Sequence, residues 1–208
     1  MGVSSQAMTL AVSAPAPVDV RARDAVLACI GRFGLAKTTI DDIAREAGCS
    51  RATLYRYFDG KPEIVGGAVV TENERITGVV IAAGRAAPTF ADAVVAAVVA
   101  GARELRGHDA LQFLLAHEPE AILGHLAFGP GDRLLIAVGD AIAPAFDRWL
   151  TRADAARAGD WLARLVRSYV LMPQPPIDFT DATAARAFLA QFVLPGLATA
   201  GLDESRQR

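Results

Sequence analysis

The sequence has few of the features that mark a secreted, metal-binding or membrane-spanning protein. It contains only two cysteines, Cys29 and Cys49, which fall within apolar helical patterns and lack the spacing of metal ligands. We interpret both as buried free thiols, which favours a reducing compartment. The longest apolar run, residues 93–102, is about half the length needed to cross a bilayer, so we expect a cytoplasmic protein without a membrane span.

Signatures of catalysis and of cofactor binding are equally scarce. The sequence shows no nucleophile–base pair, no glycine-rich phosphate loop and no set of metal ligands at a recognisable spacing. Its three histidines, His108, His117 and His125, are too far apart to form a known metal motif. We therefore expect neither an enzyme nor a resident metal or cofactor.

Positive charge is sparse and unevenly distributed. The 208-residue chain has a formal net charge of −2, which is unusual for a protein that binds nucleic acid. Residues 19–61, however, carry eight cations and six anions, and both lysines of the chain, Lys37 and Lys61, lie there. Contact with a polyanion would depend on a few placed side chains more than on a broad basic face.

No segment has the alternating pattern of a strand, and the chain reads as a succession of helices. We expect an all-α fold of about nine helices, three of them in an N-terminal domain. Beyond that domain, the expected helices span residues 62–83, 89–107, a segment capped by Asp109, a segment from Asp132 that Pro144 kinks, residues 153–171, and a last helix capped by Thr180 and Asp181 before Pro195.

We expect the chain to fall into four parts. Residues 1–18 are rich in alanine, serine and proline and carry no charge, which predicts a disordered arm. Residues 19–62 form a small helical domain, residues 63–197 a larger helical domain, and residues 198–208 a flexible tail.

The most informative pattern is TTIDDIAREAGCSRATLYRYFDGK, residues 38–61. Apolar residues recur at helical spacing in its first half, Gly48 suits a helix C-cap, and Ser50 suits the N-cap of a second helix over residues 51–58. Leu54 and Phe58 would face inward. An ordinary αα-hairpin on a globular surface shares this outline, so the outline alone does not distinguish it from a helix-turn-helix.

The complete string resembles the DNA-binding region of the tetracycline-repressor-like (TetR) family of bacterial transcriptional regulators, over roughly residues 19–65. Cys49 stands where a valine is usual in that family, and Tyr57 where a histidine or tyrosine is common. The matching residues are Phe33, Gly34, Thr38, Thr39, Ile43, Ala44, Ala47, Gly48, Ser50, Thr53, Leu54, Tyr55, Tyr57, Phe58 and Lys61.

Several side chains of this region are candidates for DNA contact. Arg51, at the start of the second helix, has a planar fork that can pair with guanine in the major groove. Ala52 and Thr53 are small enough to allow close approach. The resemblance further implies that Tyr55 spans base and backbone, and that phosphates are held by Thr39, Ser50, Tyr57 and Lys61. Arg56 is either a further contact or a solvated charge.

The larger domain is expected to bind an effector and to dimerise. We expect a hydrophobic or aromatic effector, acyl chains included, and candidates for its pocket are Val98, Ala102, Phe113, Leu114, His117, Phe128, Trp161, Leu165 and Tyr169. An apolar stripe of this kind also suits an ordinary core. The helices around residues 161–171 and 184–193 are the expected homodimer interface, and the resemblance implies the same elements.

These observations predict a ligand-responsive regulator: a repressor that binds palindromic operator DNA as a dimer and is released by a small apolar effector. A ligand-independent DNA-binding regulator shares the same N-terminal domain and needs no pocket. An all-helical enzyme acting on an apolar substrate is the more remote alternative, because it leaves the string at residues 38–61 unexplained.

Overall fold

The computed structural model describes residues 16–121, 138–172 and 176–200. Nine α-helices lie entirely within these ranges, residues 119–121 and 138–142 are also helical, and the described residues contain no strand. The all-α prediction is confirmed. The expectations for the N-terminal arm up to residue 15, for Phe128, for the helix start at Asp132 and for the tail beyond residue 200 concern residues outside the described ranges.

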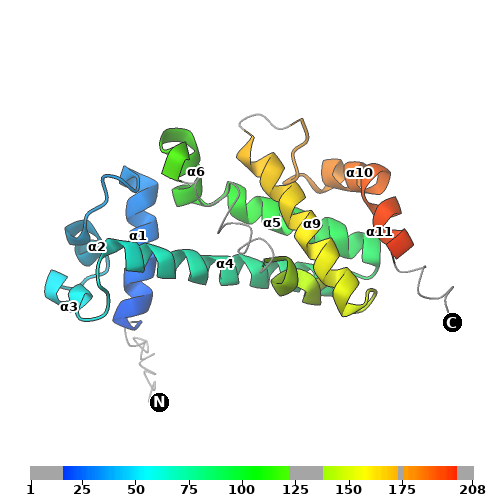
Figure 1. Ribbon diagram of the computed structural model, residues 1–208. Coiled ribbons are helices and arrows are strands. Elements are labelled where there is room, and N and C mark those ends of the chain that lie inside the picture. Colours follow the sequence, from blue (N-terminus) through cyan, green and yellow to red (C-terminus); the bar gives the residue numbers. More distant parts are fainter. Residues whose placement is uncertain (1–15, 122–137, 173–175, 201–208) are drawn as a thin grey trace, which may run out of the picture.

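The N-terminal domain, residues 18–60, is called the head. It consists of α1 (Val18–Phe33), α2 (Ile40–Glu46) and α3 (Arg51–Tyr55), which gather at one end of the molecule (Figure 1). These helices enclose a small apolar core that the first turns of the next helix complete. Its largest fully buried members are Val26, Ile43, Leu54 and Ile64.

The long helix α4 (Lys61–Ala86) leaves the head and runs through the rest of the molecule, which is called the body (Figure 1). Its 26 residues correspond to about 39 Å of helix. The sequence predicted a helix over residues 62–83, and the structure extends it by about one turn. This helix is the covalent connection between head and body, and α6 (Asp109–His117) of the body also packs against α1.

The body packs its helices around α5 (Phe90–Arg106), which lies between α4 and α9 (Arg152–Leu171) (Figure 1). Its stretch from Ala93 to Ala102 is mostly buried, as an almost continuous apolar run requires. The other body elements are α6 (Asp109–His117), η1 (Ala143–Ala145), α9 (Arg152–Leu171), α10 (Ala182–Phe192) and α11 (Leu194–Ala200).

Three predicted helix ends were wrong. The second helix of the motif ends at Tyr55 instead of Phe58, because the amides of Tyr57 and Phe58 both turn back to the carbonyl of Leu54. The side chain of His108, not Asp109, caps α6 by accepting a hydrogen bond from the Leu111 amide at 3.2 Å. The chain does not stop being helical at Pro195, since α11 follows α10.

The proline in α11 occupies its first turn, where the missing N–H has no intrahelical partner to lose. The cysteines also differ from the expectation of two buried thiols, because Cys29 is buried and Cys49 is only half-buried. Burial raises the pKa of the Cys29 thiol, with smaller contributions of the same sign from the charges of Glu46 and Asp42.

Candidate nucleic-acid interface and internal cavity

The turn between α2 and α3 is defined by two local features of the sequence. Gly48 has φ of 63°, a left-handed conformation that only glycine adopts without strain. Ser50 then caps α3, because its hydroxyl accepts a hydrogen bond from the Thr53 amide at 3.1 Å. A five-residue helix therefore stands out from the head with a fixed start and a fixed direction.

The outer face of α3 is unusually rich in exposed aromatic surface. Leu54 is buried and holds the helix on the head, whereas Tyr55 and Tyr57 each remain 51% exposed. Arg51 and Ala52 are exposed on the same short segment, and Thr53 is half-buried. Exposed rings next to a guanidinium are poorly explained by the packing of a monomer, and they suit contact with bases and phosphates.

Arg51 is held in place by two neighbours and remains accessible. Its Nε lies 3.2 Å from an Asp41 carboxylate oxygen, and its guanidinium carbon lies 5.8 Å from the centre of the Tyr55 ring. Hydrogen bonding to Tyr55, followed by the charge of Asp41, raises the pKa of this guanidinium above its usual value. An exposed ion pair of this kind is weak and can be exchanged for a base edge.

Thr39 lies at the start of α2 and serves as its cap. Its hydroxyl accepts a hydrogen bond from the Asp42 amide at 3.2 Å, and the Asp42 carboxylate accepts one from the Thr39 amide at 3.0 Å. The Thr39 side chain, and to a lesser extent Arg45, hold the pKa of Asp42 below its usual value. Thr39 is exposed, so the cap and a phosphate contact are compatible.

Lys61 is positioned differently from the free phosphate clamp that the sequence suggested. Its ammonium donates hydrogen bonds to the carbonyls of Leu35 at 2.8 Å and Thr38 at 2.9 Å, and the side chain is half-buried. Two of its three donors thus tie the start of α4 to the loop between α1 and α2. This structural role was missed because the sequence does not show which loop returns to Lys61.

A partly open cavity of about 390 Å³ lies between α1, α4, α5, α6 and α9. Its volume falls within the range of small-molecule sites, and nearly all its wall is apolar. Its lining residues come from the head as well as the body. They include Leu27, Ile30, Leu35, Val65, Val69, Ile76, Val80, Val98, Leu105, Leu111, Leu114, Ile142, Leu162, Val166 and Val170.

Most of the predicted pocket residues lie elsewhere. Val98 and Leu114 line the cavity, whereas Phe113, His117, Trp161, Leu165, Tyr169 and Ala102 do not, and Phe128 is outside the described residues. On α9 the cavity face carries Leu162, Val166 and Val170. The face of α9 that the sequence predicted to line a pocket therefore differs by one residue from the face that lines the cavity. A shift of one residue corresponds to a rotation of about 100° around the helix axis.

The predicted pocket residues that do not line the cavity contact other parts of the molecule. The Phe113 ring stacks on His117 with centroids 4.4 Å apart, beside Gly34 at the end of α1. Tyr169 lies against Phe179, with ring centroids 4.5 Å apart. Trp161 is 45% exposed on the outer face of α9.

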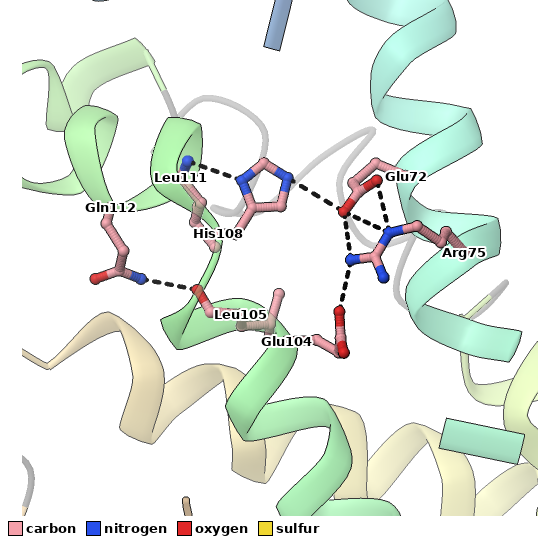
Figure 2. Close-up of polar contacts among 7 residues, drawn as sticks. All are labelled: Glu72, Arg75, Glu104, Leu105, His108, Leu111 and Gln112. Atoms are coloured by element: carbon pink, nitrogen blue, oxygen red, sulfur yellow. Dashed lines mark hydrogen bonds and ion pairs between the residues drawn. The ribbon is translucent and has the colours of Figure 1, made fainter. Parts of the chain in front are cut away.

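A polar network borders the cavity where α4, α5 and α6 meet (Figure 2). Arg75 donates to Glu72 at 2.7 Å and to Glu104 at 2.6 Å, and the Nε2 atom of His108 lies 3.4 Å from Glu72. Hydrogen bonds from Arg75 hold the pKa of Glu72 below its usual value. Because Nδ1 of His108 accepts the Leu111 amide, a neutral His108 carries its proton on Nε2, towards Glu72.

The described residues hold no group of three or more histidine, cysteine, aspartate or glutamate side chains that could bind a metal ion. No helix in the described ranges is long and apolar enough to span a membrane.

Comparison with known proteins supports the interpretation of the head. Residues 23–67 match the model of a family described as bacterial regulatory proteins, tetR family. An uncharacterised HTH-type transcriptional regulator of Mycobacterium tuberculosis is 30% identical over 159 residues, which covers 75% of this chain and 73% of that protein.

Solved structures share the fold over most of this chain. The TetR family repressor AlkX from Dietzia sp. strain DQ12-45-1b has a TM-score of 0.67 at 19% identity, over 89% of this chain and 98% of that one. The fatty acid degradation regulator FadR from Bacillus halodurans has a TM-score of 0.53 at 16% identity, over 84% of this chain and 98% of that one.

Proposed function

The chain belongs to the tetR family of bacterial regulatory proteins, a family of DNA-binding transcriptional regulators, and we propose that it is a repressor released from a palindromic operator by an apolar effector. The observation that carries this proposal is the exposed face of α3 with Arg51 and Tyr55, together with the exposed Tyr57 just after the helix. The proteins to which the chain is related are transcriptional regulators, which argues against the alternative of an all-helical enzyme.

In this proposal α3 enters the major groove with its N-terminus first. Arg51 pairs with a guanine, Ala52 and Thr53 allow close approach, and Tyr55 spans base and backbone. Thr39, Ser50 and Tyr57 contact phosphates at the edges of the groove. Lys61 contributes at most its remaining donor, since Leu35 and Thr38 occupy the other two.

One head covers only a few base pairs, so specific binding requires two heads held in a fixed relation. We assign dimerisation to the outer faces of α9 and α10, where large apolar side chains remain exposed. Trp161 is 45% exposed and Phe192 is 63% exposed, and burying such large apolar side chains would favour association. Two such heads read half-sites about 34–36 Å apart.

The cavity is the proposed effector site. Its apolar wall favours a hydrophobic compound, and two proteins of similar fold carry names in keeping with this. AlkX is described as implicated in the biodegradation of n-alkanes, and FadR as a regulator of fatty acid degradation. A ligand-independent regulator, the alternative, would have no use for this cavity.

The effector and the operator communicate through α4 in this proposal. This helix forms one wall of the cavity from Val65 to Val80, and its first turns complete the core of the head. A compound that binds one arrangement of α4 more tightly than another shifts the separation of the two heads. The expected coupling is about 1–3 kcal/mol, or roughly 5–150-fold in operator affinity.

The test uses the protein's own ligand. The purified protein is denatured, the released apolar compound is extracted with organic solvent, and operator affinity is measured with and without that extract. We expect weaker operator binding, and operator DNA must weaken binding of the compound by the same factor. A bound compound whose affinity is identical with and without operator would show that the regulator is not switched by this site.

A further inference from the structure

An acidic side chain lies beside the arginine of the DNA-reading surface. Asp41 is in the first turn of α2, and its side chain is 54% exposed. Both of its carboxylate oxygens face Arg51 of α3: Nε lies 3.2 Å from Oδ1, and Nη1 donates a hydrogen bond to Oδ2 at 3.3 Å. A negative charge on a surface that meets phosphates weakens DNA binding, so its position here requires a reason.

The needs of α2 alone do not account for this contact. An acid in the first turn stabilises the positive end of a helix, and Asp42 already does so while it completes the Thr39 cap. Arg45 lies four residues after Asp41 on the same helix, a spacing that favours an ion pair, but it pairs with Asp42 at 3.2 Å. Asp41 instead contacts the neighbouring helix.

Arg51 is restrained on two sides by this arrangement. It is the first residue of α3, and the Ser50 cap fixes its backbone. Its long side chain could otherwise rotate about several bonds. The Asp41 carboxylate of α2 engages one part of the guanidinium, and the guanidinium carbon lies 5.8 Å from the centre of the Tyr55 ring.

The contact leaves donors free for a base. A guanidinium has five N–H donors. Asp41 faces one at Nε and one at Nη1, and a hydrogen bond to Tyr55 takes a third. Two donors remain, which is the number that O6 and N7 of guanine accept. The ion pair can therefore persist while Arg51 pairs with a base.

We propose that Asp41 is a positioning residue for Arg51: its carboxylate restricts the guanidinium to the orientation that pairs with guanine, and it thereby sets the sequence preference at that base pair. This inference rests on the proposed function, in which Arg51 reads a guanine. The same carboxylate could instead accept a hydrogen bond from N4 of cytosine, but it would then have to release Arg51.

This arrangement acts on specificity more than on affinity. A free arginine can turn to other acceptors, such as N7 of adenine or a phosphate oxygen, whereas a restrained guanidinium matches the paired acceptors of guanine. The carboxylate also repels phosphates, which lowers the affinity for every sequence alike. Specificity is a difference of affinities, so a residue that weakens binding overall improves specificity when the wrong bases lose more.

The test measures discrimination by the full-length protein on the operator that it selects from a random DNA pool. Discrimination is the ratio of two dissociation constants from fluorescence anisotropy, one for the operator with its guanine replaced by adenine in both half-sites and one for the operator itself. We expect Asp41→Ala to lower this ratio at least about threefold and to bind unrelated DNA more tightly. Inactive protein in a preparation affects both constants equally, so it cancels in the ratio.

Two further variants separate positioning from a general effect of charge or structure. Asp24→Ala removes an exposed acid from α1, and it should leave the ratio unchanged. In the double variant Asp41→Ala/Arg51→Ala the ratio should equal that of Arg51→Ala alone, because a carboxylate that acts through the arginine has no effect once the arginine is absent.

The possible failures are distinguishable. If Arg51→Ala lowers discrimination and Asp41→Ala does not, the positioning role is wrong and the proposed function stands. If Asp41→Ala changes the preference at a cytosine and does so equally without Arg51, the carboxylate reads a base itself, which also overturns the inference. If the wild type selects no sequence at all, the base-reading role of α3 fails, and the inference fails with it.

Discussion

The head and the body of this molecule are stabilised in different ways. The head has short helices of 16, 7 and 5 residues, connected by specific polar contacts. Arg21 donates to the Ala47 carbonyl at 2.6 Å, Thr38 donates to the Gly34 carbonyl at 2.6 Å, and Lys61 bonds two further carbonyls. The body packs helices of 7 to 26 residues around a larger apolar core and retains a cavity among them. Polar contacts between its elements also occur, such as that of Arg186 with Asp92 at 2.6 Å.

In the proposed function, this difference would allow one chain both to read DNA and to respond to a ligand. Directional hydrogen bonds fix the position of α3 on the head, and a base-reading surface requires that rigidity. Apolar packing is not directional, so a body held by it can accommodate an occupant with small shifts of its helices. Near Leu27 and Val65 the cavity borders the head, so an occupant there would lie against the helices that carry the DNA-reading surface.

The largest expected effect comes from separating the two bodies of the proposed dimer. Phe192→Asp places a carboxylate in the exposed apolar face of α10, and it should give monomers that no longer bind a palindrome cooperatively, with the head still folded. The matched control is Gln191→Asp, the same charge on the adjacent exposed residue. Sedimentation that shows an unchanged dimer for Phe192→Asp would place the interface elsewhere.

The next effect concerns the reading face of the head. Arg51→Ala should cost about 1–3 kcal/mol on the selected operator and relax the preference at one position of each half-site. Arg45→Ala removes a cation from α2 that is more exposed than Arg51, and it should leave sequence preference intact. Anisotropy titrations on operators with single base changes measure both variants. Unchanged preference in Arg51→Ala would contradict its base-reading role.

Lys61 tests whether polar ties stabilise the head. Lys61→Met removes the donor for the carbonyls of Leu35 and Thr38, and it should lower the free energy of unfolding by about 1–3 kcal/mol. Lys37→Met, at an exposed position, should change it by less than about 0.5 kcal/mol. Urea unfolding measures this difference. If both variants are equally stable, the ammonium contributes to DNA contact alone, and the salt dependence of binding should then fall by about one charge per head.

Two glycines of α4, Gly78 and Gly84, test how this helix packs in the body. An added methyl group at Gly78 meets no atom within 4 Å, so Gly78→Ala should stabilise the protein by up to about 1 kcal/mol. At Gly84 the same group would lie 2.7 Å from the Ala145 Cβ, so Gly84→Ala should be destabilising. Thermal unfolding of the two variants should shift in opposite directions, and shifts of the same sign would contradict this packing of α4 against η1.

The smallest expected effect is the pH dependence of a polar anchor in the body. Asp154 is 6% exposed at the start of α9, and the Thr151 hydroxyl, followed by Arg157, holds the pKa of its carboxyl below its usual value. Because the folded-state pKa is lowered, the stabilisation is present above the unfolded value of about 3.9 and is lost as the pH falls through the folded value.

The comparison for this prediction is between two asparagine variants. Asp154→Asn should flatten the decline in unfolding free energy between about pH 5 and pH 2. Asp147→Asn, an exposed carboxylate paired with Arg85, is the matched control. Equal acid sensitivity in wild type and Asp154→Asn would show that this anchor does not contribute.

The sequence predicted the head better than the cavity for a physical reason. Helix caps and turns depend on residues close together in the sequence. The helix ends at Thr39, Gly48 and Ser50 could therefore be predicted from these residues themselves. The cavity depends on the rotation of each helix face about its axis, and an error of one residue on α9 replaced Leu162 and Val166 with Trp161 and Leu165. The contribution of Leu27 and Ile30 was not predictable, because nothing in the chain marks α1 as a wall of a distant pocket.

The most direct test of the account is selection of DNA from a random pool with the full-length protein, repeated with Arg51→Ala. We expect enrichment of an inverted repeat whose half-sites lie about 34–36 Å apart, one turn of B-DNA. In the variant, one position of each half-site should lose its preference while the spacing is retained. Enrichment of a single unrepeated motif, or the same preference in both proteins, would contradict a dimeric regulator that reads its operator through α3.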